Sequence, residues 1–228
     1  MGTNGNHIIP VGVLTYKRPD LLMRTLETFV SFNRDHLDRF RFFIFVQACP
    51  DLETLAVINY YPNMFEGIIL SKENIGHVAG FMKVLHEAAQ NYPNAKYLMM
   101  LEDDWESQDS LGKYLDEILT FLDSDPSVGY IRLRATHQRV FNKNRMTRKG
   151  IKYIPVSDLI YKSNGHFTTN PVIFRREILQ HFAEYPVHKE IQMVEVCHYL
   201  DECGAQLKKD CFWHIGIGRI QRPRPWRG

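Results

Sequence analysis

The first half of the chain alternates four times between a short apolar run and a longer amphipathic segment. The apolar runs are rich in Val, Ile, Leu and Phe and are typical of buried strands, whereas the segments after them repeat apolar residues at helical spacing. This alternation predicts a parallel sheet with helices on both faces. We expect strands at 8–14, 42–46, 67–70 and 97–101, and helices at 20–32, 51–60, 76–91 and 110–122.

The pattern changes in the second half, where shorter apolar runs predominate. No linker or low-complexity segment separates the two halves, and 228 residues are enough for one large domain. We therefore expect a single domain over 1–228, with a first half at about 1–125 and a second at about 126–228. In the second half the sequence predicts strands at 130–133 and 152–155, helices at 176–185 and 190–203, and a final apolar run at 211–215.

Charge and cysteine usage exclude several classes of protein. The chain has 28 Lys and Arg against 26 Asp and Glu, a balance that argues against a nucleic-acid-binding protein. No apolar stretch reaches the ~20 residues of a membrane span, and the N-terminus lacks the features of a signal peptide. The four cysteines fit no zinc or redox motif, which favours reduced thiols in a cytoplasmic protein. The basic tail at Arg222–Arg227 is compatible with peripheral contact to an anionic membrane.

Three consecutive carboxylates, Glu102–Asp104, end the fourth predicted strand. In open parallel sheets, ligands bind at the carboxyl ends of the strands. Like charges this close repel one another, and burial adds a desolvation cost. A divalent cation such as Mn²⁺ or Mg²⁺ relieves both, so the triplet predicts a metal site. The alternative is a solvated acidic turn that caps a helix beyond Trp105.

Several motifs of common nucleotide-binding and hydrolytic enzymes are missing. There is no GxxxxGK[ST] loop and no GxSxG elbow, which argues against a P-loop NTPase and an α/β-hydrolase. Polar residues instead follow each of the first three predicted strands, at 15–18, 47–50 and 71–77.

Together these segments resemble the GT-A-fold glycosyltransferases, especially their family-2-like group. Val11–Pro19 resembles the first strand and nucleotide loop, and Glu73–Gly80 the loop after the third strand. Leu101–Asp104 resembles the DxD-type metal motif, in the EDD form of N-acetylglucosaminyltransferase I-type enzymes. Asn164–Arg176 is similar to the acceptor-side segment, and Phe212–Gly216 to the closing H-x-G segment.

The resemblance implies a metal-dependent, inverting glycosyltransferase with a GT-A fold. It would move a sugar from a nucleoside-diphosphate donor, with a UDP-sugar favoured, to a hydroxyl of a carbohydrate or glycoconjugate. Mn²⁺ or Mg²⁺ would be held by Asp104, Asp103 and His214, and Asp103 would also meet the ribose. The resemblance implies that the donor nucleotide lies against Thr15, Tyr16, Arg18, Asn74 and Gly76. Gln47 stands where the resembling enzymes usually have Asp and would hydrogen-bond the base, and Lys83 either offers positive charge to the diphosphate or is a solvated helix lysine.

Inverting transfer needs a general base to deprotonate the acceptor hydroxyl. The best candidate is Glu195, which lies among apolar residues that would raise its pKa and at about the family's distance before the closing His. Glu190 and Asp158 are rival candidates.

Two other functions stay open. The first is a sugar-1-phosphate nucleotidyltransferase, although no Gly-rich loop bearing Arg or Lys follows the first predicted strand. The second is a degenerate transferase that serves as a carbohydrate-binding module. Gln47 supports it, because the resembling enzymes usually have Asp at this position, but the intact Glu102–Asp104 triplet argues against it.

Overall fold

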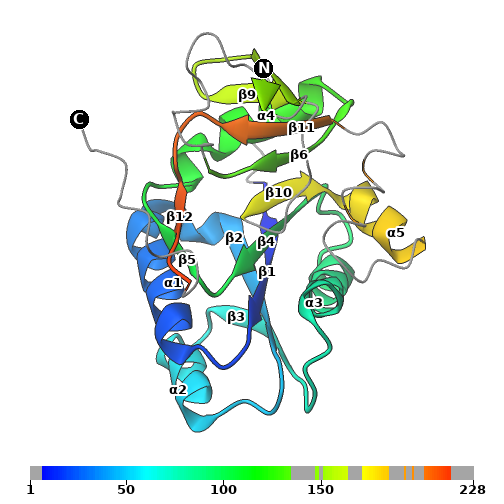
Figure 1. Ribbon diagram of the computed structural model, residues 1–228. Coiled ribbons are helices and arrows are strands. Elements are labelled where there is room, and N and C mark those ends of the chain that lie inside the picture. The colour runs from blue at the N-terminus through cyan, green and yellow to red at the C-terminus, as the bar shows by residue number, and fades with distance from the viewer. Residues whose placement is uncertain are drawn as a thin grey trace.

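The structure is a computed structural model that describes residues 7–134, 147–148, 151–163, 171–184, 193, 197 and 203–216. Within these ranges the chain forms a mixed α/β fold around one large sheet (Figure 1). The predicted fold class, an α/β fold with helices on both faces of a central sheet, is confirmed. Each described helix is too short or too polar to span a lipid bilayer.

The first half contributes four parallel neighbours to the sheet, in the order β3-β2-β1-β4. Each predicted strand of this half is present, and the boundaries differ by two residues or fewer. These strands are β1 (Ile9–Thr15), β2 (Phe40–Val46), β3 (Phe65–Leu70) and β4 (Tyr97–Glu102). The helices are α1 (Pro19–Phe32), α2 (Leu52–Tyr60), α3 (His77–Asn91) and α4 (Leu115–Ser124), with short 3-10 helices η1 (Arg34–Arg39) and η2 (Gly112–Tyr114).

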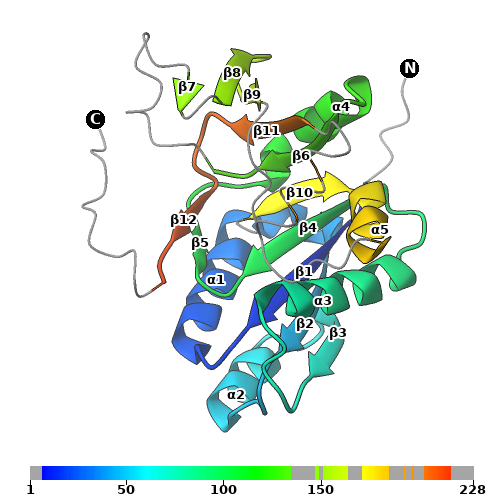
Figure 2. The ribbon, with the colours of Figure 1, turned by 45° about the vertical axis from the view of Figure 1, so that its right-hand side comes forward.

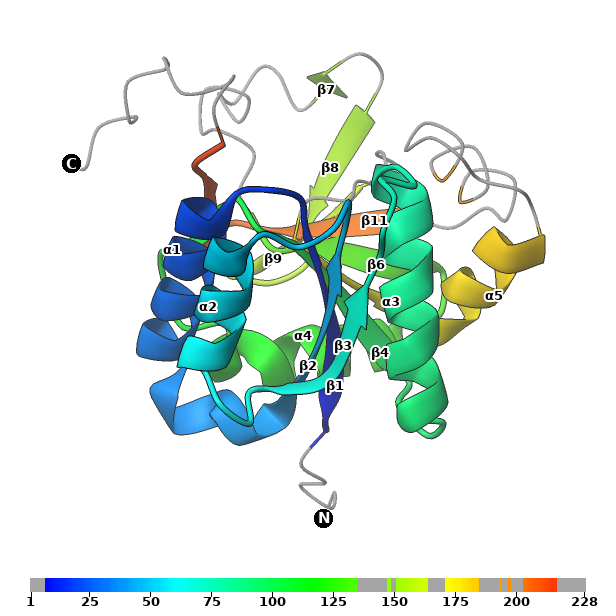
Figure 3. The same cartoon turned by 90° about the horizontal axis from the view of Figure 1, so that it is seen from below.

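The central strands are apolar on both faces, because each face packs against helices. Val11 and Val13 of β1 face a core shared with α1 and α4, whereas Leu14 faces a second core beneath α3 and α5 (Arg176–Glu184). The view from below shows α1 and α2 on one side of the sheet and α3 and α5 on the other (Figure 3). At Gly12 a β-carbon would lie 3.0 Å from side chains of α3, so the glycine lets this helix pack closely on β1.

The second half continues the same sheet through an antiparallel strand. β10 (Val172–Arg175) lies between β4 and β6 (Val128–Arg132) and runs antiparallel to both. The sheet then continues in the order β11-β9-β8-β7, and β11 runs parallel to β6. The outer strands are β7 (Thr147–Arg148), β8 (Ile151–Pro155), β9 (Ile160–Ser163) and β11 (Cys203–Leu207).

The sequence pattern did not predict β9, β10 or β11. Each has five residues or fewer, and runs this short carry little periodicity. The helix expected at 190–203 is wrong at its end, because Cys203 begins β11. Met193 and Cys197 are helical and buried, and the other residues of that segment lie outside the described ranges.

A separate two-stranded sheet brings the end of the described chain back to the acidic triplet. β12 (Phe212–His214) pairs antiparallel with β5 (Trp105–Ser107), which directly follows Asp104. Figure 2 shows this pair beside α1, away from β7, β8 and β9 at the far end of the large sheet. Trp105 therefore begins a strand, and the alternative of a helix capped beyond it is wrong.

Candidate active site

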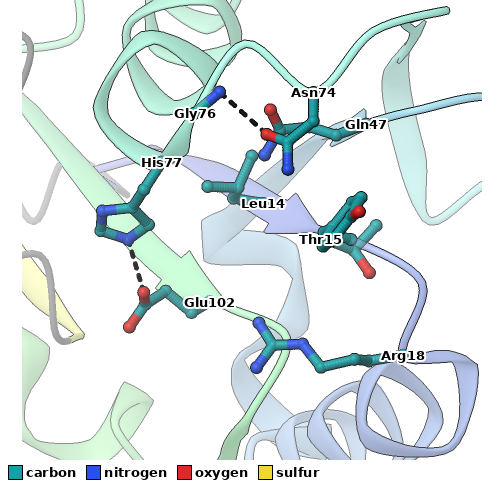
Figure 4. A pocket seen from close by; sticks show the side chains of 9 residues that line it. Leu14, Thr15, Arg18, Gln47, Asn74, Gly76, His77 and Glu102 are labelled. Atoms are coloured by element: carbon teal, nitrogen blue, oxygen red, sulfur yellow. Dashed lines mark hydrogen bonds and ion pairs between the residues drawn. The ribbon is translucent and has the colours of Figure 1, made fainter.

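A cavity of about 220 Å³ lies where the carboxyl ends of β1, β2 and β4 meet the start of α3 (Figure 4). This is the edge of a parallel sheet where ligands bind in this class of fold. The cavity takes residues from all three strand-end loops predicted from the sequence and from the end of β4. Its lining comprises Leu14, Thr15, Tyr16, Arg18, Gln47, Asn74, Gly76, His77 and Glu102.

The backbone turns sharply in two of these loops. Lys17, which follows β1, and Ala48 and Cys49, which follow β2, have left-handed φ angles of 50°, 58° and 51°. Non-glycine residues adopt this conformation at an energetic cost, and such residues cluster at functional sites. The turn at Lys17 precedes Arg18, and Pro19 then begins α1 with a favourable φ.

Asp103 is fully buried at the end of β4 and faces the loop after β1. Its Oδ2 accepts hydrogen bonds from the Thr15 hydroxyl at 2.7 Å and from the Tyr16 backbone N–H at 3.2 Å. Its Oδ1 lies 2.5 Å from Arg18 Nη2, in an ion pair whose angles do not make a hydrogen bond. Burial raises the pKa of Asp103 to about 7, although Arg18 and Thr15 oppose the shift.

Asp104 lies between Arg18 and His214. Its Oδ2 accepts a hydrogen bond from Arg18 Nη1 at 2.9 Å and lies 3.2 Å from His214 Nε2. Burial by itself would raise the pKa of Asp104, but its contacts with His214 and Arg18 outweigh burial and lower it. Asp104 Oδ1 and His214 Nδ1 are buried and make no hydrogen bond. The site thus holds a carboxylate oxygen that is desolvated and unused.

The β5–β12 pair fixes this arrangement. His214 is the cross-strand partner of Trp105, and their rings lie 5.0 Å apart. Beyond the strand, the Ile215 N–H donates to the Asp104 carbonyl at 2.8 Å. A β-carbon at Gly216 would lie 2.4 Å from Asp104 Oδ2, so the chain passes the carboxylate at a point where a side chain would collide with it.

Glu102 points into the cavity, away from this cluster. Its Oε1 lies 2.5 Å from His77 Nε2, at the start of α3, and its Oε2 accepts a hydrogen bond from Trp105 Nε1 at 2.9 Å. Figure 4 shows Glu102 and His77 facing one another across the cavity wall. His77 is not among the site residues predicted from the sequence. The sequence feature that could have identified it is its position directly after Gly76, in the loop that follows the third predicted strand.

The loops after β2 and β3 are held together by Gln47. Its Oε1 accepts a hydrogen bond from the Ile75 N–H at 3.1 Å, and the Asn74 Oδ1 accepts one from the Gly76 N–H at 2.9 Å. Gly76 has a φ of 87°, and this left-handed conformation directs the chain into α3. The N-terminus of α3, which carries partial positive charge, therefore meets the cavity.

The structure gathers most of the predicted nucleotide-binding residues at this cavity. Lys83 is not among them, because its side chain is exposed on α3 and does not line the cavity. Asp158 is exposed in the turn between β8 and β9, and Glu190 and Glu195 lie outside the described residues. The predicted residues that line the cavity are Thr15, Tyr16, Arg18, Gln47, Asn74 and Gly76.

The fit of a metal ion depends on Asp104 and His214. Within the described ranges, no group of three or more His, Cys, Asp or Glu side chains is arranged to hold a metal ion. Asp104 and His214 nevertheless offer an oxygen and a nitrogen ligand at one point, and Asp104 Oδ1 is unused. Mg²⁺ and Mn²⁺ commonly bind through one or two protein ligands together with substrate phosphates. The donor set fits such a shared site.

Comparisons with known proteins identify the fold. The sequence matches no protein-family model and no curated protein. Among solved structures, the chain is similar to the S. aureus protein TarS, residues 1–349, with a TM-score of 0.58 and 15% identity over 91% of this chain and 60% of that one. It is also similar to the mannosyltransferase PcManGT from Pyrobaculum calidifontis in complex with GDP-Man and Mn²⁺, with a TM-score of 0.50 and 14% identity over 75% of this chain and 45% of that one.

A nucleotide-sugar synthetase has the same fold. The CMP:2-keto-3-deoxy-manno-octonic acid synthetase in complex with CTP matches with a TM-score of 0.53 and 9% identity, over 87% of this chain and 88% of that one. TarS has also been solved with UDP and with UDP-GlcNAc. This chain spans about half the length of the PcManGT and TarS structures, 45% and 60%. It therefore shares the GT-A-like fold of enzymes that handle nucleotide sugars.

Proposed function

We propose that the protein is a metal-dependent glycosyltransferase that moves a sugar from a nucleoside-diphosphate donor to a hydroxyl of a carbohydrate or glycoconjugate. The observation that carries the proposal is a cavity at the carboxyl ends of parallel strands, with the Asp103–Asp104 pair directly beside it. The fold shared with TarS and PcManGT supports it. In this proposal Glu102–Asp104 is an EDD form of the DxD motif.

The cavity suits the nucleoside part of such a donor. Tyr16 lines it, is 38% exposed and carries an aromatic ring of the kind on which bases stack. The N-terminus of α3 and the guanidinium of Arg18 supply positive charge for the diphosphate. The Gln47 oxygen is engaged by the Ile75 N–H, so the amide that this side chain presents to a ligand is a donor. We keep a UDP-sugar as the favoured donor.

Asp104 and His214 would hold Mn²⁺ or Mg²⁺ together with the diphosphate, and Asp103 would meet the ribose. The bound ion would stabilise the negative charge of the departing nucleoside diphosphate. Asp103 keeps Thr15, Tyr16 and Arg18 in position through its own contacts. A carboxylate from the second half, for which we keep Glu195, would take the proton of the acceptor hydroxyl in an inverting transfer.

A thermal-shift panel of nucleoside diphosphates, with and without Mn²⁺, tests this proposal. A ligand at 100 times its Kd stabilises the folded state by about 2.7 kcal/mol, which raises the Tm of a protein of this size by about 5–11 °C. We expect a shift with one nucleotide that requires Mn²⁺ and is lost in Asp104→Asn. Glu106→Gln is the matched control, because Glu106 is a nearby acid that pairs with Arg24 instead. No shift with any nucleotide would contradict the proposal.

The synthetase among the structural neighbours favours a second candidate, a sugar-1-phosphate nucleotidyltransferase, because its match covers most of both chains. The two activities release different products. Incubation with a nucleoside triphosphate and a sugar phosphate yields pyrophosphate in the second case, whereas a glycosyltransferase releases nucleoside diphosphate from a nucleotide sugar. Parallel assays for pyrophosphate and for nucleoside diphosphate therefore distinguish the two activities.

A further inference from the structure

We propose that Arg18 is an internal counter-ion of the acidic pair, which competes with a divalent cation for Asp104 and leaves it when the diphosphate of the donor binds. Arg18 and the cation are thus alternative partners of one carboxylate. The part that concerns the diphosphate rests on the proposed function. The competition between Arg18 and the cation rests on the geometry of the acidic pair.

The guanidinium bridges the two carboxylates with separate nitrogens. Arg18 Nη2 lies 2.5 Å from Asp103 Oδ1, and Arg18 Nη1 lies 2.9 Å from Asp104 Oδ2. The contact with Asp104 is a hydrogen bond and the contact with Asp103 is an ion pair, so one guanidinium serves both acids. With both carboxylates ionised, this contact supplies the positive charge that a metal ion would otherwise bring.

The same oxygen faces His214. Asp104 Oδ2 is the atom closest to His214 Nε2, at 3.2 Å, so it is the atom that a cation shared by these two residues would take. A cation bound there would lie within a few ångströms of the guanidinium. Positive charges at so short a distance repel one another, and they do so more strongly near a protein surface than in bulk water. The cation and the guanidinium therefore compete for Asp104 Oδ2.

Arg18 is partly exposed to solvent, whereas the two carboxylates are buried. Its side chain is 39% exposed, against 0% for Asp103 and 9% for Asp104. Arg18 precedes α1 and makes no capping hydrogen bond with its side chain. It also lines the cavity, and Figure 4 shows it reaching from the start of α1 towards the end of β4. A diphosphate in the cavity offers the guanidinium a second anionic partner at a short distance.

Cation and nucleotide binding are then coupled. Without nucleotide, the ion must displace Arg18, so it binds weakly. With a diphosphate present, Arg18 has a new partner and the ion gains phosphate ligands, so each ligand strengthens the binding of the other.

Mn²⁺ titrations of the full chain without nucleotide, followed by electron paramagnetic resonance of the free ion, test the competition directly. We expect Arg18→Gln to bind Mn²⁺ about fivefold tighter or more than the wild type, because it removes the competing charge and keeps a side chain of similar polarity. The gain should disappear in the Arg18→Gln/Asp104→Asn double variant.

Arg24→Gln is the matched control. Arg24 lies on α1 and pairs with Glu106 at 2.7 Å, so it is a second arginine of the same region that holds a different acid. It should leave the Mn²⁺ affinity unchanged. Arg18→Lys keeps the positive charge and should tighten Mn²⁺ binding by less than twofold. Arg18→Lys also replaces Arg18→Gln as the test variant if the glutamine variant fails to fold.

An unchanged or weaker Mn²⁺ affinity in folded Arg18→Gln would overturn the inference, and so would a gain that persists without the Asp104 carboxylate. If Arg18→Gln does not fold, the Mn²⁺ affinity of Arg18→Lys decides. An affinity about fivefold higher than that of the wild type would overturn the inference, because the lysine keeps the positive charge. These outcomes do not depend on any nucleotide. Failure of the proposed function appears separately, as the absence of every nucleotide-induced shift in the wild-type protein.

Discussion

Gly216 lies at the point where the site leaves no room for a β-carbon. An alanine there would place its β-carbon 2.4 Å from Asp104 Oδ2, so either the carboxylate or the chain after β12 must move. We predict that Gly216→Ala weakens Mn²⁺-dependent nucleotide binding at least tenfold. Isothermal titration with and without Mn²⁺ measures this loss.

The control for this variant is Gly67→Ala in β3, far from the acidic pair in the sheet order. A β-carbon at Gly67 would lie 2.5 Å from the Phe43 ring, so we expect a loss of about 1–3 kcal/mol in the free energy of unfolding from overpacking. Its nucleotide binding should be unchanged. If both variants bind nucleotide like the wild type, Gly216 has no part in the site.

Single residues of the site were predictable where the strand-end rule applies. Thr15, Gln47 and Asn74 follow apolar runs, and the structure places all three at the cavity. The contacts were not predictable. That Arg18 bridges Asp103 and Asp104 depends on the left-handed turn at Lys17, which the sequence does not specify because lysine rarely adopts it.

At the scale of elements, Asp125 joins α4 to β9. It accepts a hydrogen bond from Lys162 Nζ at 2.6 Å, and this bond, together with the Ser127 hydroxyl, lowers the pKa of Asp125. A carboxyl with a lowered pKa in the folded state stabilises the protein above its unfolded pKa of 3.8, and this stabilisation is lost as the pH falls through the folded pKa.

We predict that Asp125→Asn lowers the Tm at pH 7 by about 1–4 °C, which corresponds to about 0.5–1 kcal/mol for a partly exposed ion pair. The difference from the wild type should begin to shrink below about pH 4 and vanish at lower pH. Differential scanning calorimetry of both proteins from pH 7 to pH 3 measures it. A difference that stays constant with pH would contradict the assignment.

Elements of the first half were predictable because β1, β2 and β4 are almost fully buried apolar runs, whereas the edge strand β3 alternates between partly buried and exposed residues. The sequence of the second half contains fewer patterns that predict strands or helices. β10 lies in the middle of the sheet, yet its four residues show no pattern that separates a central strand from a short stretch of helix. The order of the strands around β10 could not be predicted from a local sequence pattern, because its antiparallel pairing with β4 joins residues that are far apart in the sequence.

At the scale of the whole molecule, β10 joins the two halves of the sheet, because it pairs with β4 on one edge and with β6 on the other. The single domain expected over 1–228 stays a prediction. The pairing of β10 with both halves provides a way to test it. Ile173 is fully buried between Met99 and Ile131, so it contacts both halves.

We predict that Ile173→Ala lowers the free energy of unfolding by about 2–5 kcal/mol and that wild type and variant each unfold in a single cooperative transition. Calorimetry with tryptophan fluorescence measures both quantities. Two separate transitions, of which the substitution shifts one, would show that the halves are independent units.

The pairing of β5 with β12 spans three residue pairs, which join Phe212 to Ser107, Trp213 to Glu106 and His214 to Trp105. Side chains alternate between the two faces of a strand, so a slip of one residue would turn the imidazole of His214 away from Asp104. In the divergence of related sequences, an insertion in a turn outside β5 and β12 would leave this pairing in register. A single-residue insertion or deletion within either strand would remove the imidazole from the site while every residue of the cavity lining stayed in place.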